Sequence, residues 1–268
     1  MLREQKLLVW AIATFVLAVT TAVHAQVEYD VVILDPSGFT GSCALRVSDG
    51  QQVGWGGGSM SLLWSGTAES VVNLHPSGYD WSEVCDVSNG QQVGGGAIAP
   101  DVGHALLWSG TSESVVDLHP SGFDWSICEG VGDGQQVGYG DVFGVFGGDA
   151  ALLWEGSAES VVNLNPSGFT GSWALDVADG QQVGVGWLAS GEGRALLWSG
   201  TAGSVADLHP SGFDASWAEG VGDGQQVGCG VTAGWVFHAL LWSGSAGSAV
   251  DLHPTGFYAS ECGDVSSG

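Results

Sequence analysis

After about residue 26, apolar and polar residues alternate in short runs, and no stretch has the 3.6-residue periodicity of a helix. Residues 168–212 show the pattern well. Residues 172–177 alternate and are rich in strand formers, Asp179-Gly180 is a two-residue turn signal that needs positive φ, and residues 181–185 continue as a second strand. This segment predicts a β-hairpin.

The remainder of the same unit predicts two more strands. After a variable glycine-rich loop, residues 195–199 are almost wholly apolar, as expected for a short strand covered on both faces. Residues 200–203 then form a turn, and residues 204–208 are expected to be the fourth strand before Pro210 and Gly212 end the unit. One unit is therefore four short antiparallel strands.

The unit repeats along the chain. Leu-Leu-Trp occurs five times at spacings of 44, 46, 44 and 44 residues, Gln-Gln-Val-Gly recurs with it, and Leu-x-Pro-(Ser/Thr)-Gly occurs six times. Four strands in about 44 residues predict an all-β fold, a β-propeller of four-stranded blades in which the Leu-Leu-Trp strand fills the space between blades. A β-solenoid is the main alternative, but its coils are shorter and lack Asp-Gly hairpins. The expected core tryptophans are Trp64, Trp108, Trp154, Trp198 and Trp242.

The two ends of the repeat region belong to one further unit. Residues 31–36 align with 71–76, so the region opens on a fourth strand, and residues 260–268 align with a first strand. We expect five complete repeats plus two halves of a sixth, short by about 15 residues, so that the chain is a truncated product or has strand edges that a partner or self-association covers.

The first 25 residues have the features of a secretory signal. Arg3 and Lys6 precede an apolar run over residues 7–23, and Val23-His24-Ala25 offers small residues for signal peptidase. We expect cleavage after residue 25, a single propeller domain over residues 26–268 and no membrane insertion afterwards; an uncleaved anchor is the alternative.

Charge excludes several partners. The 268 residues carry 29 acidic and 4 basic side chains, a net charge of -25. Nucleic acid and anionic membrane surfaces require cationic side chains and are excluded as partners. No lysine follows Lys6, which excludes Schiff-base chemistry and a P-loop in the mature chain.

Two copies of one motif, His104-Ala-Leu-Leu-Trp108 and His238-Ala-Leu-Leu-Trp242, precede strands that end in Asp-Leu, and Gly-Gln-Gln-Val-Gly follows. In these features the chain resembles the HAF-type extracellular repeat family of bacteria. The resemblance covers nearly all of residues 27–268 and implies a secreted, propeller-like array with no assigned activity. This chain departs from the family in having leucine for the usual phenylalanine after His-Ala. It also has other residues at the repeat position of His104, namely Met60, Ala150 and Arg194.

Five further tryptophans are the ligand-binding candidates. Three lie in the variable segment between the second and third strands and two in the connections between units; they are Trp55, Trp187, Trp235, Trp81 and Trp125. Variable loops on a repeated scaffold commonly bind ligands. The two sets of connections share one face of a propeller, where such rings could stack sugars or receive a peptide; alternatively they only cap the blade edges.

Other candidate chemistry is weak. Asp101, Asp141 and Asp149 are calcium candidates, but no D-x-[DN]-x-[DN]-G loop is present. The histidines of the Leu-His-Pro motifs fit hydrogen bonding in a turn better than a metal ring. The five cysteines form no repeated framework; we expect mostly buried small side chains and at least one free thiol. No catalytic motif or cofactor site is expected.

These observations predict a secreted, non-enzymatic β-propeller that acts as an extracellular interaction or structural module, with a protein or a glycan as its partner. A carbohydrate-binding propeller that uses the variable-loop aromatics is the alternative. A glycoside hydrolase is more distant, because no pair of carboxylates departs from the repeat pattern.

Overall fold

The computed structural model describes residues 30–58, 60–99, 102–141 and 148–265. The predicted signal over residues 1–25 therefore lies outside the described residues. Residues 32–268 form one unit, which contains the five sheets of the described residues.

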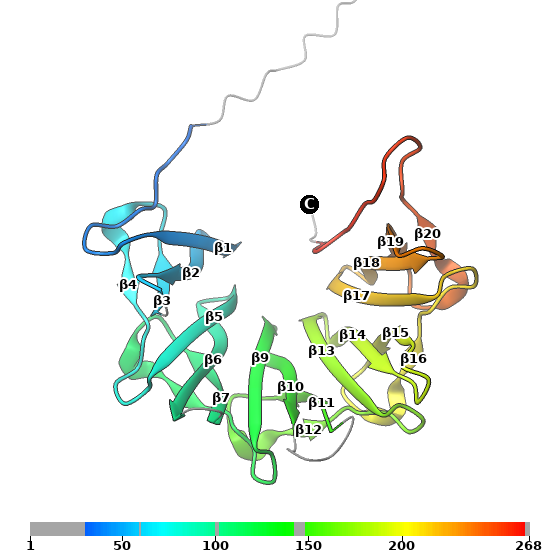
Figure 1. The fold of residues 1–268 in the computed structure, drawn as a ribbon. Helices are drawn as coiled ribbons and strands as arrows, with labels where there is room; N and C mark the ends of the chain where they lie inside the picture. Colours follow the sequence, from blue (N-terminus) through cyan, green and yellow to red (C-terminus); the bar gives the residue numbers. More distant parts are fainter. Residues whose placement is uncertain (1–29, 59, 100–101, 142–147, 266–268) are drawn as a thin grey trace, which may run out of the picture. The chain divides into compact units, whose positions relative to one another are not determined.

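Five four-stranded antiparallel sheets confirm the predicted blades, and each sheet has its strands in chain order (Figure 1). Blade 1 contains β1 (Ser42–Ser48), β2 (Gln51–Gly56), β3 (Met60–Trp64) and β4 (Val72–Asn73). Blade 2 contains β5 (Trp81–Ser88), β6 (Gln91–Ala99), β7 (Val102–Trp108) and β8 (Val116–Asp117). Blade 3 contains β9 (Trp125–Gly132), β10 (Gln135–Asp141), β11 (Ala150–Trp154) and β12 (Val162–Asn163). Blade 4 contains β13 (Gly171–Ala178), β14 (Gln181–Trp187), β15 (Gly193–Trp198) and β16 (Ala206–Asp207). Blade 5 contains β17 (Ala215–Gly222), β18 (Gln225–Thr232), β19 (Val236–Trp242) and β20 (Val250–Asp251).

The hairpin between the first two strands has the predicted backbone. Asp179 and Gly180 have φ of 54° and 72°, the left-handed values of a tight two-residue turn. Farther along the hairpin, a side chain at Gly184 would run into the Trp173 carbonyl, which explains the glycine after Gln-Gln-Val. A register shift between Ala174 and Asp176 adds a bulge to the inner strand.

The fourth strand is shorter than predicted. Residues 204–208 were expected to be extended, but Ala202–Ser204 is a short 3-10 turn and β16 covers only Ala206–Asp207. Ser204 Oγ accepts the Ser199 backbone N–H at 2.8 Å and donates to the Thr201 carbonyl at 2.6 Å. This local hydrogen bonding closes a turn where the sequence pattern indicated a strand.

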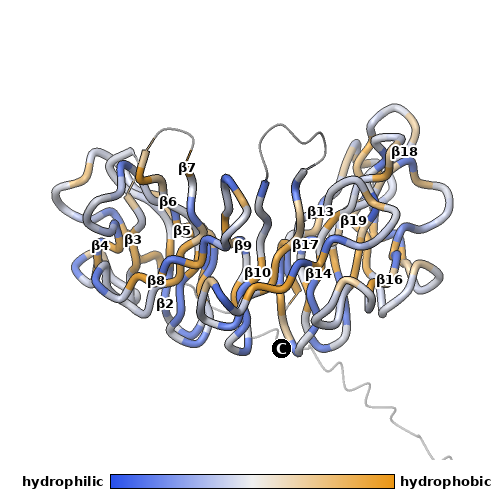
Figure 2. Tube along the Cα trace, turned by 90° about the horizontal axis from the view of Figure 1, so that it is seen from below, coloured by the Kyte–Doolittle hydropathy of each residue, from blue (hydrophilic) through white to orange (hydrophobic). Residues whose placement is uncertain are grey.

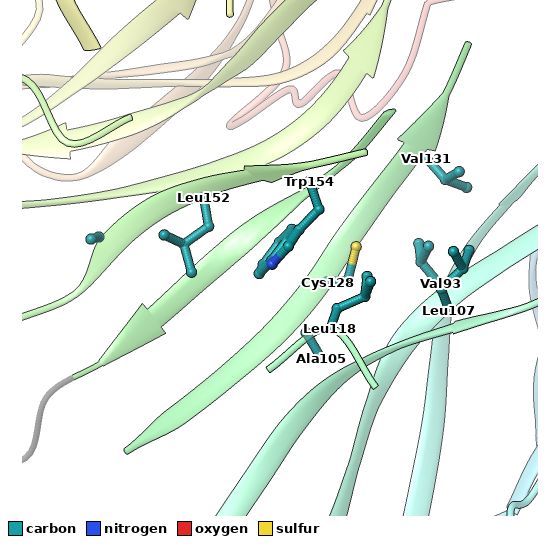
Figure 3. Packing of buried hydrophobic residues seen from close by; sticks show 9 residues of the cluster. Val93, Ala105, Leu107, Leu118, Cys128, Val131, Leu152 and Trp154 are labelled. Atoms are coloured by element: carbon teal, nitrogen blue, oxygen red, sulfur yellow. The ribbon is translucent and has the colours of Figure 1, made fainter. Parts of the chain in front are cut away.

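The core lies between successive blades. Between blades 2 and 3, Val93, Leu107 and Leu118 pack with Val131 and Trp154 (Figure 3). All five Leu-Leu-Trp tryptophans are 0% exposed, which confirms the prediction that they are core residues. Their indole N–H groups have no hydrogen-bond partner in the described structure, so packing alone holds them.

Glutamine side chains add a polar ladder between blades. Gln136 is fully buried; its Oε1 accepts the Gly156 N–H at 2.8 Å, and its Nε2 donates to the Gly134 carbonyl at 3.0 Å. The same Nε2 lies 3.5 Å from Oε1 of Gln91 in the preceding blade. Equivalent glutamines repeat these bonds in the other blades, namely Gln92, Gln182 and Gln226. The Gln-Gln-Val-Gly motif therefore joins blades as well as strands.

In the described structure, blades 1 and 5 each have one side against which no further blade packs. Apolar residues that are buried between blades elsewhere are exposed on these two sides. Val47 is 70% exposed, whereas its repeat equivalent Val87 is 3% exposed; Leu252 is 43% exposed, whereas Leu208 is fully buried. Ser260 nevertheless accepts the Ala239 N–H at 3.0 Å, as serines do at each blade junction. The structure thus has five complete blades, whereas residues 31–36 and 260–265, which were expected to be strands of a sixth, form no strand. That a partner or self-association covers the exposed sides stays a prediction.

Candidate functional site

The connections that flank the candidate tryptophans lie on one face, as predicted, but only Trp235 is itself in a connection. The other four are strand residues, within β2, at the starts of β5 and β9 and at the end of β14. The link entering each blade runs beside the end of the second strand: Thr170 N–H donates to the Trp187 carbonyl at 2.8 Å, and Asp124 N–H donates to the Asp141 carbonyl at 2.9 Å. This face is at the top of Figure 2, where the label β18 stands at the upper right. We refer to it as the aromatic face.

The five candidate tryptophans are not in one site. Trp187 and Trp235 line the same hollow, whereas Trp125 packs against Tyr139 of its own blade with ring centroids 5.5 Å apart. Trp55 lies within β2 and is 42% exposed, and Trp81 begins β5 opposite Ala97. Only the blade 4 and blade 5 tryptophans converge.

The hollow where they converge, which we call the blade 4–5 hollow, has a volume of about 510 Å³. Its walls include three indoles, two carboxylates and two hydroxyls, contributed by Trp187, Trp217, Trp235, Glu192, Asp214, Ser190 and Thr232. Trp217 was missed from the sequence because it lies in the inner strand β17. The sequence did contain a signal for it. The residue at the repeat position of Trp217 varies among the blades, whereas the serine directly before it is the same in every blade.

A row of aromatic rings leads to this hollow. Tyr139 stacks on Trp173 with centroids 4.4 Å apart, and Trp173 meets Trp187 edge to face at 4.7 Å. Trp173 Nε1 donates to Asp149 Oδ2 at 2.9 Å, which fixes the ring. These contacts tie blade 3 to blade 4 on the aromatic face. Burial and nearby acids raise the pKa of Tyr139 well above its ordinary value, so its hydroxyl stays protonated.

Charged groups beside the hollow are held in place. Arg194 donates to Glu192 from Nε at 3.0 Å and from Nη2 at 2.9 Å, and to Asp207 from Nη1 at 2.8 Å. These hydrogen bonds outweigh partial burial and raise the pKa of Arg194. Both Arg194 nitrogens reach the same oxygen, Glu192 Oε1, so the guanidinium anchors one oxygen of this carboxylate.

A second candidate, the central hollow, was not predicted from the sequence. It has a volume of about 270 Å³ where the inner strands meet, and its charged lining residues are Arg46, Asp86, Glu129, Asp133, Asp176, Glu219 and Asp264. Asp86 Oδ2 accepts the Val131 N–H of the next blade at 3.0 Å, and Asp176 Oδ2 accepts the Val221 N–H at 2.8 Å. These two carboxylates therefore join blades.

Burial governs the titration of the central acids. It raises the pKa of Asp86 from 3.8 to about 6, against the opposing effect of the Val131 and Val87 N–H groups. Burial likewise raises the pKa of Glu129, Asp176 and Glu219, and for each the nearby Arg46 partly offsets it. Within the described ranges, no three His, Cys, Asp or Glu side chains are arranged to hold a metal ion.

The Leu-His-Pro histidines join blades. His119 Nδ1 lies 2.8 Å from Ser126 Oγ, which accepts the Ala105 N–H at 3.0 Å, and Ser126 is 1% exposed. The same contact recurs at the three other blade junctions, through His75, Asn165 and His209, and once more after blade 5, between His253 and Ser260. A His–Ser pair by itself suggests a catalytic nucleophile and its base. This serine is buried, is repeated in each blade and accepts a backbone N–H, so it is unsuited to nucleophilic attack.

A second histidine contact lies within a blade. His104 Nδ1 is 2.7 Å from Asp117 Oδ2, and His104 stacks on His119 with centroids 4.2 Å apart. Arg194 and His238 face Asp207 and Asp251 in the same way. Where the first position is Met60 or Ala150, the second is asparagine (Asn73 and Asn163). A basic side chain and its aspartate thus occur together.

The remaining candidates are separate from one another. Asp101 lies outside the described residues, Asp149 accepts the Trp173 N–H, and Asp141 ends β10. All five cysteines are free. Only Cys128 and Cys229 are buried, whereas Cys85 and Cys262 are half-buried and Cys43 is exposed, so the expectation of mostly buried cysteines is wrong. Burial raises the pKa of the Cys128 thiol well above its usual range, which makes it unreactive.

The sheets and their packing define the chain as a β-propeller. Among solved structures it is similar to a putative TolB from Agrobacterium tumefaciens, with a TM-score of 0.52, 11% identity and coverage of 73% of this chain and 77% of that one. It is also similar to TolB from Acinetobacter baumannii, with a TM-score of 0.52, 12% identity and coverage of 76% of this chain and 51% of that one, so it spans about half of that protein. At these identities the likeness shows the fold alone. No protein-family model and no curated protein matches the sequence. No helix in the described residues is long and apolar enough to cross a membrane.

Proposed function

We propose that this chain is a secreted, non-enzymatic β-propeller that acts as an extracellular interaction module through its aromatic face. The observation that carries the proposal is the blade 4–5 hollow, where three indoles and two carboxylates line one concavity. The core tryptophans are wholly buried, but Trp235 is 74% exposed, so this ring contributes little to the stability of the blade.

The repeated polar contacts support a binding role over a catalytic one. The serines and histidines that could form nucleophile–base pairs are engaged at each blade junction, as in the Ser126–His119 contact. The buried thiols have raised pKa values. Reactive groups in enzymes are accessible and specific to one place, whereas these groups are buried and repeated.

The N-terminal sequence supports secretion. Two basic residues precede an apolar run and a small-residue cleavage site, as described above. The resemblance to HAF-type repeats supports the same location. A surface with a net charge of -25 suits a tryptophan-rich protein that must remain dissolved outside the cell.

Secretion is tested by expressing the full chain with a C-terminal tag in a bacterial host. Fractionation followed by N-terminal sequencing should find the protein outside the cytoplasm, beginning at Gln26. A cytoplasmic protein that retains Met1 would contradict this part of the proposal.

The interaction role is tested with the purified processed protein on arrays of glycans and of peptides. Binding should depend on Trp187 and Trp235, and Trp55→Ala, which removes an exposed indole from blade 1, should leave it unchanged. Mass spectrometry should recover the bound ligand intact. Turnover that one carboxylate or histidine substitution abolishes would show an enzyme instead.

A further inference from the structure

The turn that presents Trp235 is strained. Trp235 has φ of 63°, a left-handed value that costs a bulky residue energy and that glycine adopts freely. Its N–H donates to the Thr232 carbonyl at 3.1 Å, which closes a tight turn between β18 and β19. A strained backbone that holds an exposed indole over a hollow is more typical of a binding site than of a packing solution.

The walls below Trp235 combine flat apolar rings with oriented polar groups. Arg194 holds the Glu192 carboxylate through two donors to its Oε1, and the exposed Asp214 also lines the hollow. Sugar rings have an apolar C–H face and a rim of hydroxyls that both donate and accept. Indoles suit the C–H face, and carboxylates accept hydrogen bonds from the hydroxyls.

A neighbouring hollow extends the site. It has a volume of about 230 Å³ and is lined by Asp149, Thr170, Gly171, Trp173 and Trp187. Both hollows include Trp187, so they adjoin along the aromatic row. A ligand that fills both must be longer than one small ring.

The negative charge of the chain and of the hollow disfavours acidic ligands. The chain carries 29 acidic and 4 basic side chains, and two carboxylates face the larger hollow, so uronates and sulfated sugars would be repelled. A quaternary ammonium group would also suit three indoles, but it leaves the Ser190 and Thr232 hydroxyls and the Glu192–Arg194 pair unused.

From these features we propose that the blade 4–5 hollow and its neighbour bind a neutral glycan of two or more sugars. One sugar stacks in the larger hollow against Trp217 and Trp235, with its hydroxyls on Glu192 and Asp214, and the chain continues past Trp187 towards Trp173. This inference rests on the proposed function and names the ligand class of the same face.

The test uses the processed protein and defined oligomers of β-glucan, mannan, xylan and chitin, with uronate and sulfated sets alongside. At least one neutral tetrasaccharide should bind, roughly tenfold or more tighter than its monosaccharide. Acidic sets should not bind. Absence of binding to every neutral oligomer at millimolar concentration, or a preference for acidic sugars, overturns the inference.

Two substitutions locate the site. Trp235→Gly removes the ring and relieves the left-handed strain, so affinity should fall about tenfold or more while the melting temperature is unchanged or higher. Asp214→Ala removes an exposed carboxylate and no core packing, and it should also weaken binding. The matched control Trp55→Ala should keep affinity within about twofold. Unchanged glycan affinity in both site variants overturns the proposed location.

The second hollow has its own test. Asp149→Ala frees the Trp173 indole and should weaken tetrasaccharide binding more than disaccharide binding; equal effects on both would overturn the extended site. Peptide binding that depends on Trp235, with no glycan binding, would leave the interaction module intact and overturn only the glycan assignment.

Discussion

Replacing Asp86 with asparagine should stabilise the protein at neutral pH. Asp86 lines the central hollow and accepts the Val131 N–H of the next blade at 3.0 Å, and the Val87 N–H also favours its ionised form. Asparagine can accept the same bond through its carbonyl oxygen without an ionisable group. The substitution therefore isolates the free-energy cost of keeping this side chain ionised at the centre of the propeller.

The cost follows from the pKa of Asp86, which burial raises from 3.8 to about 6. That increase corresponds to roughly 3 kcal/mol in favour of the protonated form. At pH 7.5 the folded protein bears this cost, so Asp86→Asn should raise the free energy of unfolding by roughly 1 to 3 kcal/mol, the lower values allowing for weaker hydrogen bonding by an amide.

The sign of the pH dependence is opposite to that of a salt-bridged carboxylate. Between pH about 4 and about 6 the folded state binds more protons at Asp86 than the unfolded state does, so stability from this group is greatest at low pH and is lost as pH rises through about 6. The advantage of the asparagine variant should therefore be about 2 kcal/mol smaller at pH 4.5 than at pH 7.5.

Urea denaturation followed by tryptophan fluorescence at pH 4.5 and 7.5 measures both quantities. Asp80→Asn, at an exposed position of the same blade, is the control and should change stability by less than about 0.5 kcal/mol at either pH. The reasoning fails if Asp86→Asn is destabilising at pH 7.5, or if its effect is the same at both pH values.

Three further substitutions, one of them with a matched control, test the contacts between and within blades by urea denaturation. Val87→Ala, at a residue 3% exposed, should cost about 2 to 3 kcal/mol, while the same change at the 70% exposed Val47 should cost under about 0.5; equal losses would mean that Val47 is covered in solution. Gln136→Ala should cost about 2 to 3 kcal/mol because it leaves the Gly156 N–H without its acceptor, and a loss below about 0.5 would contradict the ladder. Gly184→Ala places a methyl group against a backbone carbonyl and should cost about 3 kcal/mol or more, so a neutral result would show that the hairpin shifts easily.

Much of the fold could be predicted from the sequence because the pattern of each strand occurs five times along the chain. The Asp179-Gly180 turn needs positive φ, and the Leu-Leu-Trp strand is too apolar to be exposed, so both were predictable from local chemistry. The short 3-10 turn at Ala202–Ser204 was missed because the Ser204 hydroxyl competes for the backbone there, which an apolar pattern does not reveal.

The site was only partly predictable. Trp187 and Trp235 stood out because they lie in variable segments, but Trp217 and the central Asp86 lie on inner strands, where nothing in one repeat shows which side faces a neighbour. Their grouping depends on contacts between blades about 45 residues apart in sequence, such as Asp86 with Val131. Trp55 and Trp81 look similar in sequence, yet they belong to blades 1 and 2, whereas residues of blades 4 and 5 line the hollow.

The two kinds of histidine contact have a consequence for how such a chain can change over time. The Ser126–His119 and Gln136–Gln91 contacts cross between blades and use residues found in nearly every repeat. The His104–Asp117 contact, whose residues vary, stays inside one blade. A whole repeat could therefore be duplicated, deleted or moved along the gene without separating a basic residue from its acid. The blades that become neighbours would still carry the residues that form the contacts between blades.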